Sequence, residues 1–194
     1  IRELASEAVK PALEDAKLTT NEIDGSVIGV AGDVFAAQGS PGALIHDYVG
    51  MRHKPSLRVE AACATGSAGV RTAWSMITAG LADVMLVVGA ETMTHVGTPM
   101  ATEWMARAGD SRWEYPFGIT FPGFYALMAT RHMHQYGTTR KQLSMVSVKS
   151  HHYGAMNPYA HLQKEVSLEE AMKSVPICQP LNLYDCCLIS DGAA

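Results

Sequence analysis

The segment from residue 57 to residue 88 limits the fold of this chain more than any other. Residues 57–61 read as a strand before the helical pattern "GSAGVRTAWSMITAG", and an unbroken apolar run follows at residues 84–88. Apolar side chains recur at helical spacing from Val70 to Leu81, and Gly80 is placed to end that helix. A strand, a helix and a strand in this order predict a βαβ unit and a parallel sheet covered on both faces.

Further elements extend this unit on both sides. Residues 1–16 keep one apolar face at helical spacing, residues 26–30 read as a buried strand, and residues 44–49 read as a short helix. Residues 92–122 show no period, so we expect a long functional loop there. Three helical patterns follow at about 124–136, 140–152 and 168–174, and the last two begin with capping-box spacing, Thr139 with Gln142 and Ser167 with Glu170. This helical layer predicts a cap or inserted subdomain.

Composition excludes several classes of protein. The 194 residues carry a net charge of −4 without a basic block, which argues against nucleic-acid binding. No apolar run approaches about 20 residues, so we expect no membrane partner. Four cysteines are too few for a disulfide scaffold, and we expect reduced thiols in the cytoplasm. The chain begins at Ile1 inside a helical pattern and ends in "LISDGAA", as if about to enter a strand, so we expect a fragment of a longer chain.

Cys63 lies where the first of these strands gives way to the helix, and three interpretations compete for it. A buried cysteine that packs as a small hydrophobe is the ordinary one. A phosphate loop is weakly supported, because the glycines at 66 and 69 do not form G-x-G-x-x-G. The third interpretation is a nucleophile, since the N-terminus of a helix favours the reactive thiolate form of a cysteine and offers N–H groups to an oxyanion. A hydrolase serine at Ser67 is excluded, because Thr65 stands where G-x-S-x-G needs glycine.

Four separate segments carry a resemblance to a known family. The segments are "AACATGSAG", "GLADVMLVVGAETMT", "YGTTRKQLSMVSVKSHHYGAMNP" and "LYDCCLISDGAA", and they occur in the family's order over nearly the whole chain. Together they resemble the thiolase family, and in particular its archaeal and sterol-carrier-type members. The resemblance implies an N-terminal half with a layered α/β/α core at residues 1–95, a mainly helical loop or cap domain at 96–180, and a return to the core at 181–194.

The resemblance also implies a reaction. In such enzymes a cysteine takes an acyl group from acyl-CoA, and a second acetyl-CoA attacks the thioester to give acetoacetyl-CoA, or the reverse thiolysis runs. Cys63 matches this nucleophile, while Glu91 of the G-x-E-x-M stretch is expected to organise backbone. The family's catalytic histidine and second cysteine are expected beyond residue 194, so none of the eight histidines is assigned. Cys186 and Cys187 are interpreted as packing residues, Cys178 lacks a metal partner, and no metal or cofactor beyond the coenzyme A thioester is expected.

The cap is expected to cover the pantetheine tunnel and to shape the acyl pocket. Candidate lining residues, for each of which core packing is the alternative, are Phe117, Phe121, Phe124, Tyr125 and Met128. The resemblance implies a homodimer or homotetramer and, for some archaeal members, a complex with the hydroxymethylglutaryl-CoA synthase of the mevalonate pathway and a small zinc-bearing bridging protein. Two alternatives stay open: a non-catalytic acyl-CoA-binding or complex subunit, and a ketosynthase acting on carrier-protein thioesters.

Overall fold

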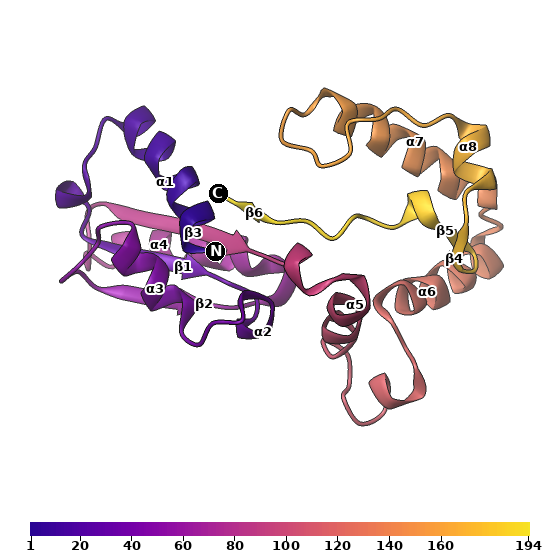
Figure 1. The fold of residues 1–194 in the computed structure, drawn as a ribbon, viewed down its shortest axis with the longest axis horizontal. Coiled ribbons are helices and arrows are strands. Elements are labelled where there is room, and N and C mark those ends of the chain that lie inside the picture. Colours follow the sequence, from indigo (N-terminus) through magenta and orange to yellow (C-terminus); the bar gives the residue numbers. More distant parts are fainter. The chain divides into compact units, whose positions relative to one another are not determined.

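The computed structural model describes all 194 residues, which form two compact units (Figure 1). The first unit comprises residues 1–101 and 190–194, and the second comprises residues 102–189. We expect boundaries near residues 95 and 180 from the sequence. The first observed boundary lies between residues 101 and 102, inside the helix Thr98–Ala106, and the second lies between residues 189 and 190.

A four-stranded sheet with the order β2-β1-β3-β6 forms the centre of the first unit. The strands β1 (Gly25–Gly29), β2 (Ser56–Val59) and β3 (Met85–Glu91) are parallel, and β6 (Gly192–Ala193) pairs antiparallel with the end of β3. Strand β1 lies between β2 and β3, so the predicted βαβ unit crosses over it. The parallel sheet is therefore confirmed, and the closing segment does enter a strand.

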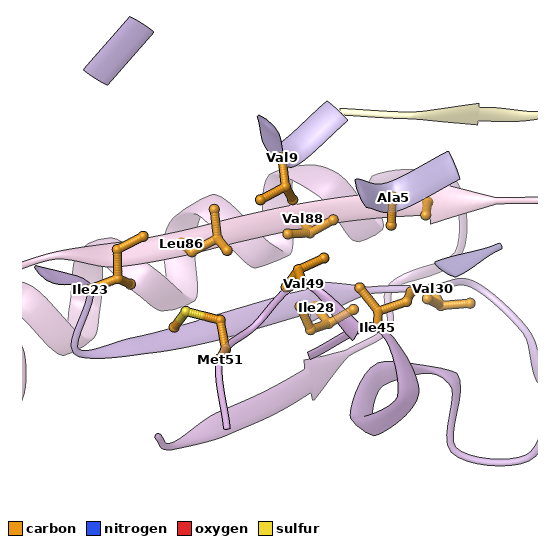
Figure 2. Packing of buried hydrophobic residues seen from close by; sticks show 11 residues of the cluster. Ala5, Val9, Ile23, Ile28, Val30, Ile45, Val49, Met51, Leu86 and Val88 are labelled. Atoms are coloured by element: carbon orange, nitrogen blue, oxygen red, sulfur yellow. The ribbon is translucent and has the colours of Figure 1, made fainter. Parts of the chain in front are cut away.

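Helices cover both faces of this sheet, as predicted. On one face, α1 (Arg2–Ala16) and α3 (Pro41–Tyr48) pack against apolar side chains of β1 and β3. Figure 2 shows this cluster, whose members include Val9, Ile28, Ile45, Met51 and Val88. Burial of such side chains is the main favourable contribution to folding.

Helix α4 (Thr65–Thr78) packs on the other face of the sheet through its small residues. A Cβ atom added to Gly69 would lie 3.1 Å from Val87 Cγ1, and Ala73 is 5% exposed. The larger side chains of the predicted apolar repeat face outward instead, and Trp74 is 65% exposed. The periodicity located the helix correctly, but close approach to the sheet selects small residues for the contact.

Helices dominate the second unit. The helices α6 (Phe121–Tyr136), α7 (Arg140–Met156) and α8 (Leu168–Lys173) match the three predicted patterns, and both predicted capping boxes form. Helix α6 begins earlier than predicted because Thr120 caps it, accepting a hydrogen bond from the Gly123 N–H. A short hairpin of β4 (Pro176–Cys178) and β5 (Leu181–Asn182) follows α8.

Two helices were not predicted. Helix α5 (Thr98–Ala106) lies within the stretch expected to be an irregular loop, and α2 (Asp33–Ala36) follows β1. The buried positions of α5 are occupied by Ala101 and Ala106, whose small side chains give little periodic signal. None of the helices in the structure is both long and apolar enough to cross a membrane.

Candidate active site

Cys63 lies at the strand-to-helix turn that the sequence predicts. Strand β2 ends at Val59, a 3₁₀ turn covers Ala62–Ala64, and α4 begins at Thr65. The Cys63 thiol is exposed and unpaired, so the alternative of a buried packing cysteine does not describe it. Its role as a nucleophile remains a prediction, but the group that such chemistry needs is accessible.

The backbone around Cys63 is held by two neighbouring side chains. The Thr65 hydroxyl accepts a hydrogen bond from the Ala61 N–H at 2.9 Å and donates one to the Ala62 carbonyl at 2.6 Å. The Glu60 carboxylate accepts a hydrogen bond from the Ala62 N–H. Ala62 itself has a φ of 47°, in the left-handed region that residues other than glycine seldom adopt. The residue before Cys63 therefore has an unusual conformation, and hydrogen bonds stabilise it.

The turn also depends on close packing between α4 and β1. Thr65 is buried, and a Cβ atom added to Gly29 would lie 2.9 Å from Thr65 Cγ2. Only glycine at the end of β1 allows the first residue of α4 to come this near. Cys63 is consequently placed at the carboxyl edge of the parallel strands, where open α/β sheets bind their ligands.

Glu91 lies at the same edge, at the end of β3. Its Oε2 accepts a hydrogen bond at 3.0 Å from the Ala31 N–H in the segment after β1, whereas Oε1 is buried without a partner. Burial raises the pKa of this carboxyl group, against the opposing effect of hydrogen bonds from backbone N–H groups that include Ala31. The structure supports the expected backbone-organising role, because one carboxylate joins two strand ends.

Arg58, near the end of β2, links that strand to the segment that follows β1. Its guanidinium pairs with the Asp33 carboxylate and donates a hydrogen bond at 3.2 Å to the Val30 carbonyl. The stem of the side chain runs past Gly42 of α3, where an added Cβ would lie 3.1 Å from Arg58 Cβ. Sequence reasoning did not single out Arg58, although a charged residue inside a predicted strand is a usable signal.

Asp191 anchors the returning strand beside β3. Its carboxylate accepts hydrogen bonds from the Met93 N–H at 2.6 Å, from the Thr94 N–H at 2.9 Å and from the Thr94 hydroxyl at 2.7 Å. Burial opposes ionisation, but these hydrogen bonds outweigh it and lower the pKa of Asp191. The segment that follows Glu91 is thereby held to β6.

Four of the proposed acyl-pocket residues gather around one cavity within the second unit. The cavity has a volume of about 200 Å³ and is lined by Phe121, Phe124, Tyr125 and Met128, together with Ala106, Ala108, Gly109, Ile119 and Thr120. Phe117 does not line it and is 71% exposed. The cavity walls contain no charged side chain, which suits an apolar ligand group.

The remaining three cysteines lie in the other compact unit of the chain. Cys178, Cys186 and Cys187 belong to the second unit, and burial and the nearby Asp185 raise the pKa of the Cys186 thiol. No three His, Cys, Asp or Glu side chains come together in a way that could hold a metal ion. Among the histidines, His46 is buried and hydrogen-bonded to Ser26 at 2.7 Å, which indicates a role in packing.

Comparisons with known proteins agree with this picture. The family "Thiolase, N-terminal domain" matches residues 1–194. The acetyl-CoA acetyltransferase of Methanothermobacter thermautotrophicus is 42% identical over all 194 residues, which cover 50% of that protein. Sterol carrier protein 2 of Bos taurus is 34% identical over 99% of the chain and 36% of that protein.

A solved structure extends the similarity to the fold. The structure named "Ltp2-ChsH2(DUF35) aldolase" superimposes with a TM-score of 0.76 at 28% identity and covers 99% of this chain and 48% of that one. The chain spans half the length of the archaeal acetyltransferase it matches.

Proposed function

This chain belongs to the thiolase family, whose N-terminal domain it matches over its whole length, and we propose that it supplies the acyl-accepting cysteine of an acetyl-CoA C-acyltransferase. One observation carries the proposal: the exposed Cys63 thiol lies at the strand-to-helix turn before α4, at the carboxyl edge of the parallel sheet. Acetyltransferase relatives at 42% identity support the same activity.

The proposed reaction has two steps. The Cys63 thiolate attacks the carbonyl carbon of acetyl-CoA, a new C–S bond forms, and coenzyme A leaves as its thiolate and takes a proton. A second acetyl-CoA then loses a proton from its α-carbon, and the resulting carbanion attacks the acyl-cysteine. A C–C bond forms, the Cys63 thiolate is released, and the product is acetoacetyl-CoA. Thiolysis is the reverse of this sequence.

We propose that the groups that move protons belong to the other half of the relatives' length. The exposed histidines of this chain lie outside the turn that carries Cys63, and the Glu60 carboxylate at that turn accepts a hydrogen bond from the Ala62 N–H. In the second unit, the cavity lined by Phe121, Phe124, Tyr125 and Met128 is proposed to receive the apolar part of the substrate. No cofactor besides the coenzyme A thioester is part of the proposal.

Partners and location are extensions of the same proposal. We propose a homodimer or homotetramer that acts in the cytoplasm, where the four unpaired cysteines would stay reduced. A complex with a hydroxymethylglutaryl-CoA synthase and a zinc-bearing bridging protein is proposed for the mevalonate pathway. A second candidate function, a subunit whose partner is required for activity, is favoured by the similarity to an aldolase whose name joins two components.

Acetyl labelling tests the leading proposal. The full-length protein incubated with acetyl-CoA should gain one acetyl mass on the peptide that contains Cys63, and prior iodoacetamide treatment should block the gain. Cys63→Ala should abolish both labelling and turnover. Cys187→Ala, which removes the other exposed thiol, should leave both intact and is the matched control. An unlabelled but folded full-length protein would contradict the enzymatic function and favour the subunit role.

A further inference from the structure

We infer that Thr65 is a positioning residue for Cys63, because it holds Ala62 in a left-handed conformation that aims the thiol. The inference deepens the proposed function and rests on it. It starts from Ala62, whose φ of 47° is unfavourable for any residue with a Cβ atom. Such a conformation persists only where surrounding contacts require it, and such positions cluster at functional sites.

Two of the three side-chain hydrogen bonds that hold the backbone around Ala62 are made by one hydroxyl group. Thr65 Oγ1 accepts a hydrogen bond from the Ala61 N–H and donates one to the Ala62 carbonyl, so one oxygen binds both the peptide group that precedes Ala61 and the peptide group that follows Ala62. The Glu60 carboxylate binds the Ala62 N–H from the other side. Cys63 follows directly, so its place depends on the peptide that Thr65 holds.

Thr65 is itself fixed by packing. It is 7% exposed, and its methyl group lies against Gly29 at the end of β1, where an added Cβ would come within 2.9 Å. The sheet thereby sets the position of the hydroxyl, and the hydroxyl sets the position of the turn. Support of this kind, from a buried group on a rigid element, is what a reactive side chain needs for a defined geometry.

Paired substitutions test the inference in the full-length protein. Thr65→Val keeps the shape but removes the hydroxyl, and it should slow both iodoacetamide alkylation of Cys63 and acetyl transfer by about tenfold. The free-energy cost of the left-handed conformation for alanine corresponds to about one order of magnitude in rate. The loss should be in kcat, with KM for acetyl-CoA unchanged, and Thr65→Ser should restore most of it. Thr72→Val removes a hydroxyl that bonds only the Ala68 carbonyl of the same helix, and should have no effect.

A second background separates positioning from folding. Glycine adopts a positive φ without penalty, so in an Ala62→Gly protein the Thr65→Val substitution should cost only about twofold. Circular dichroism should report the same folded state for all variants. Any of three results would overturn the inference. These are equal losses of rate from Thr65→Val in the parent and in the Ala62→Gly protein, a Thr65→Val protein that reacts as fast as the parent, and a Thr65→Ser protein that reacts as slowly as Thr65→Val. A parent protein that is alkylated but never acetylated would refute the proposed function alone, because the alkylation rates still test Thr65.

Discussion

Glu91 is a carboxyl group whose ionisation the fold opposes. Its carboxyl group is half-buried, with Oε1 lacking a partner, and burial raises its pKa above the ordinary value of 4.5. The folded state therefore binds a proton more tightly than the unfolded state does. By linkage, the stabilisation from protonated Glu91 is fully present below pH 4.5 and is lost as the pH rises through the raised pKa.

Replacement by glutamine tests this sign. Because Glu91→Gln does not ionise, the free energy of unfolding of the parent relative to this variant should fall as the pH rises above 4.5. Urea unfolding at a series of pH values measures the difference. Asp191→Asn serves as a control of opposite sign, since the pKa of Asp191 is lowered and its stabilisation is lost as the pH falls below 3.8. A Glu91→Gln difference that is constant with pH would contradict the assignment.

Helix α4 presents its large apolar side chains to solvent in this chain. Val70 and Trp74 are each more than half exposed, while Gly69 and Ala73 contact the sheet. Exposed apolar stretches of this kind mark surfaces that other protein segments cover. The large members of the apolar repeat and the packing face of the helix are thus different sets of residues, while Ala73 belongs to both the repeat and the packing face.

Two substitutions to larger side chains on α4 distinguish its buried face from its exposed face. Ala73→Leu should destabilise the chain by about 1–3 kcal/mol, because the added carbon atoms have no space against the sheet. Val70→Leu adds bulk on the solvent face and should change stability by less than about 0.5 kcal/mol. Urea unfolding of residues 1–194 compares them. Equal effects of the two substitutions would show that the packing face is assigned wrongly.

The molecule as a whole consists of two compact units. The first is organised by the sheet and its two helical layers, and the second by α6, α7 and α8. Within the second unit, Asp185 accepts a 2.6 Å hydrogen bond from Ser147 and pairs with Arg140, which ties the turn after β5 to α7. Units with their own contacts tend to open separately.

A core truncation should therefore act within one unit. Ile28 is fully buried in β1, and Ile28→Ala should destabilise the sheet by about 2–5 kcal/mol. Hydrogen exchange measured by mass spectrometry should speed up in β1 and β3. Exchange of the α7 amides should remain at the parent rate. Faster exchange in both places would show that the two units unfold as one.

Much of the local structure around the candidate site could be predicted from the sequence. The strand pattern at residues 57–61 and the apolar repeat after Cys63 predicted the strand, the turn and the helix, because these patterns depend on neighbouring residues. The caps at Thr139 and Ser167 were equally local. The resemblance suggested Phe117, Phe121, Phe124, Tyr125 and Met128 as one apolar group, and all of them except Phe117 line one cavity. Helix α5 escaped prediction because its buried alanines give no periodic contrast.

The order of residues alone determined the strand–helix–strand unit, the cysteine at its corner and the family resemblance, all of which depend on near neighbours. Only the tertiary structure decided that β1 lies between β2 and β3, that Thr65 rests on Gly29, and that Glu91 reaches the Ala31 amide. These pairings join residues far apart in the chain, and local propensity does not encode such contacts. They form because packing removes apolar surface from water and leaves each buried polar group to find a partner.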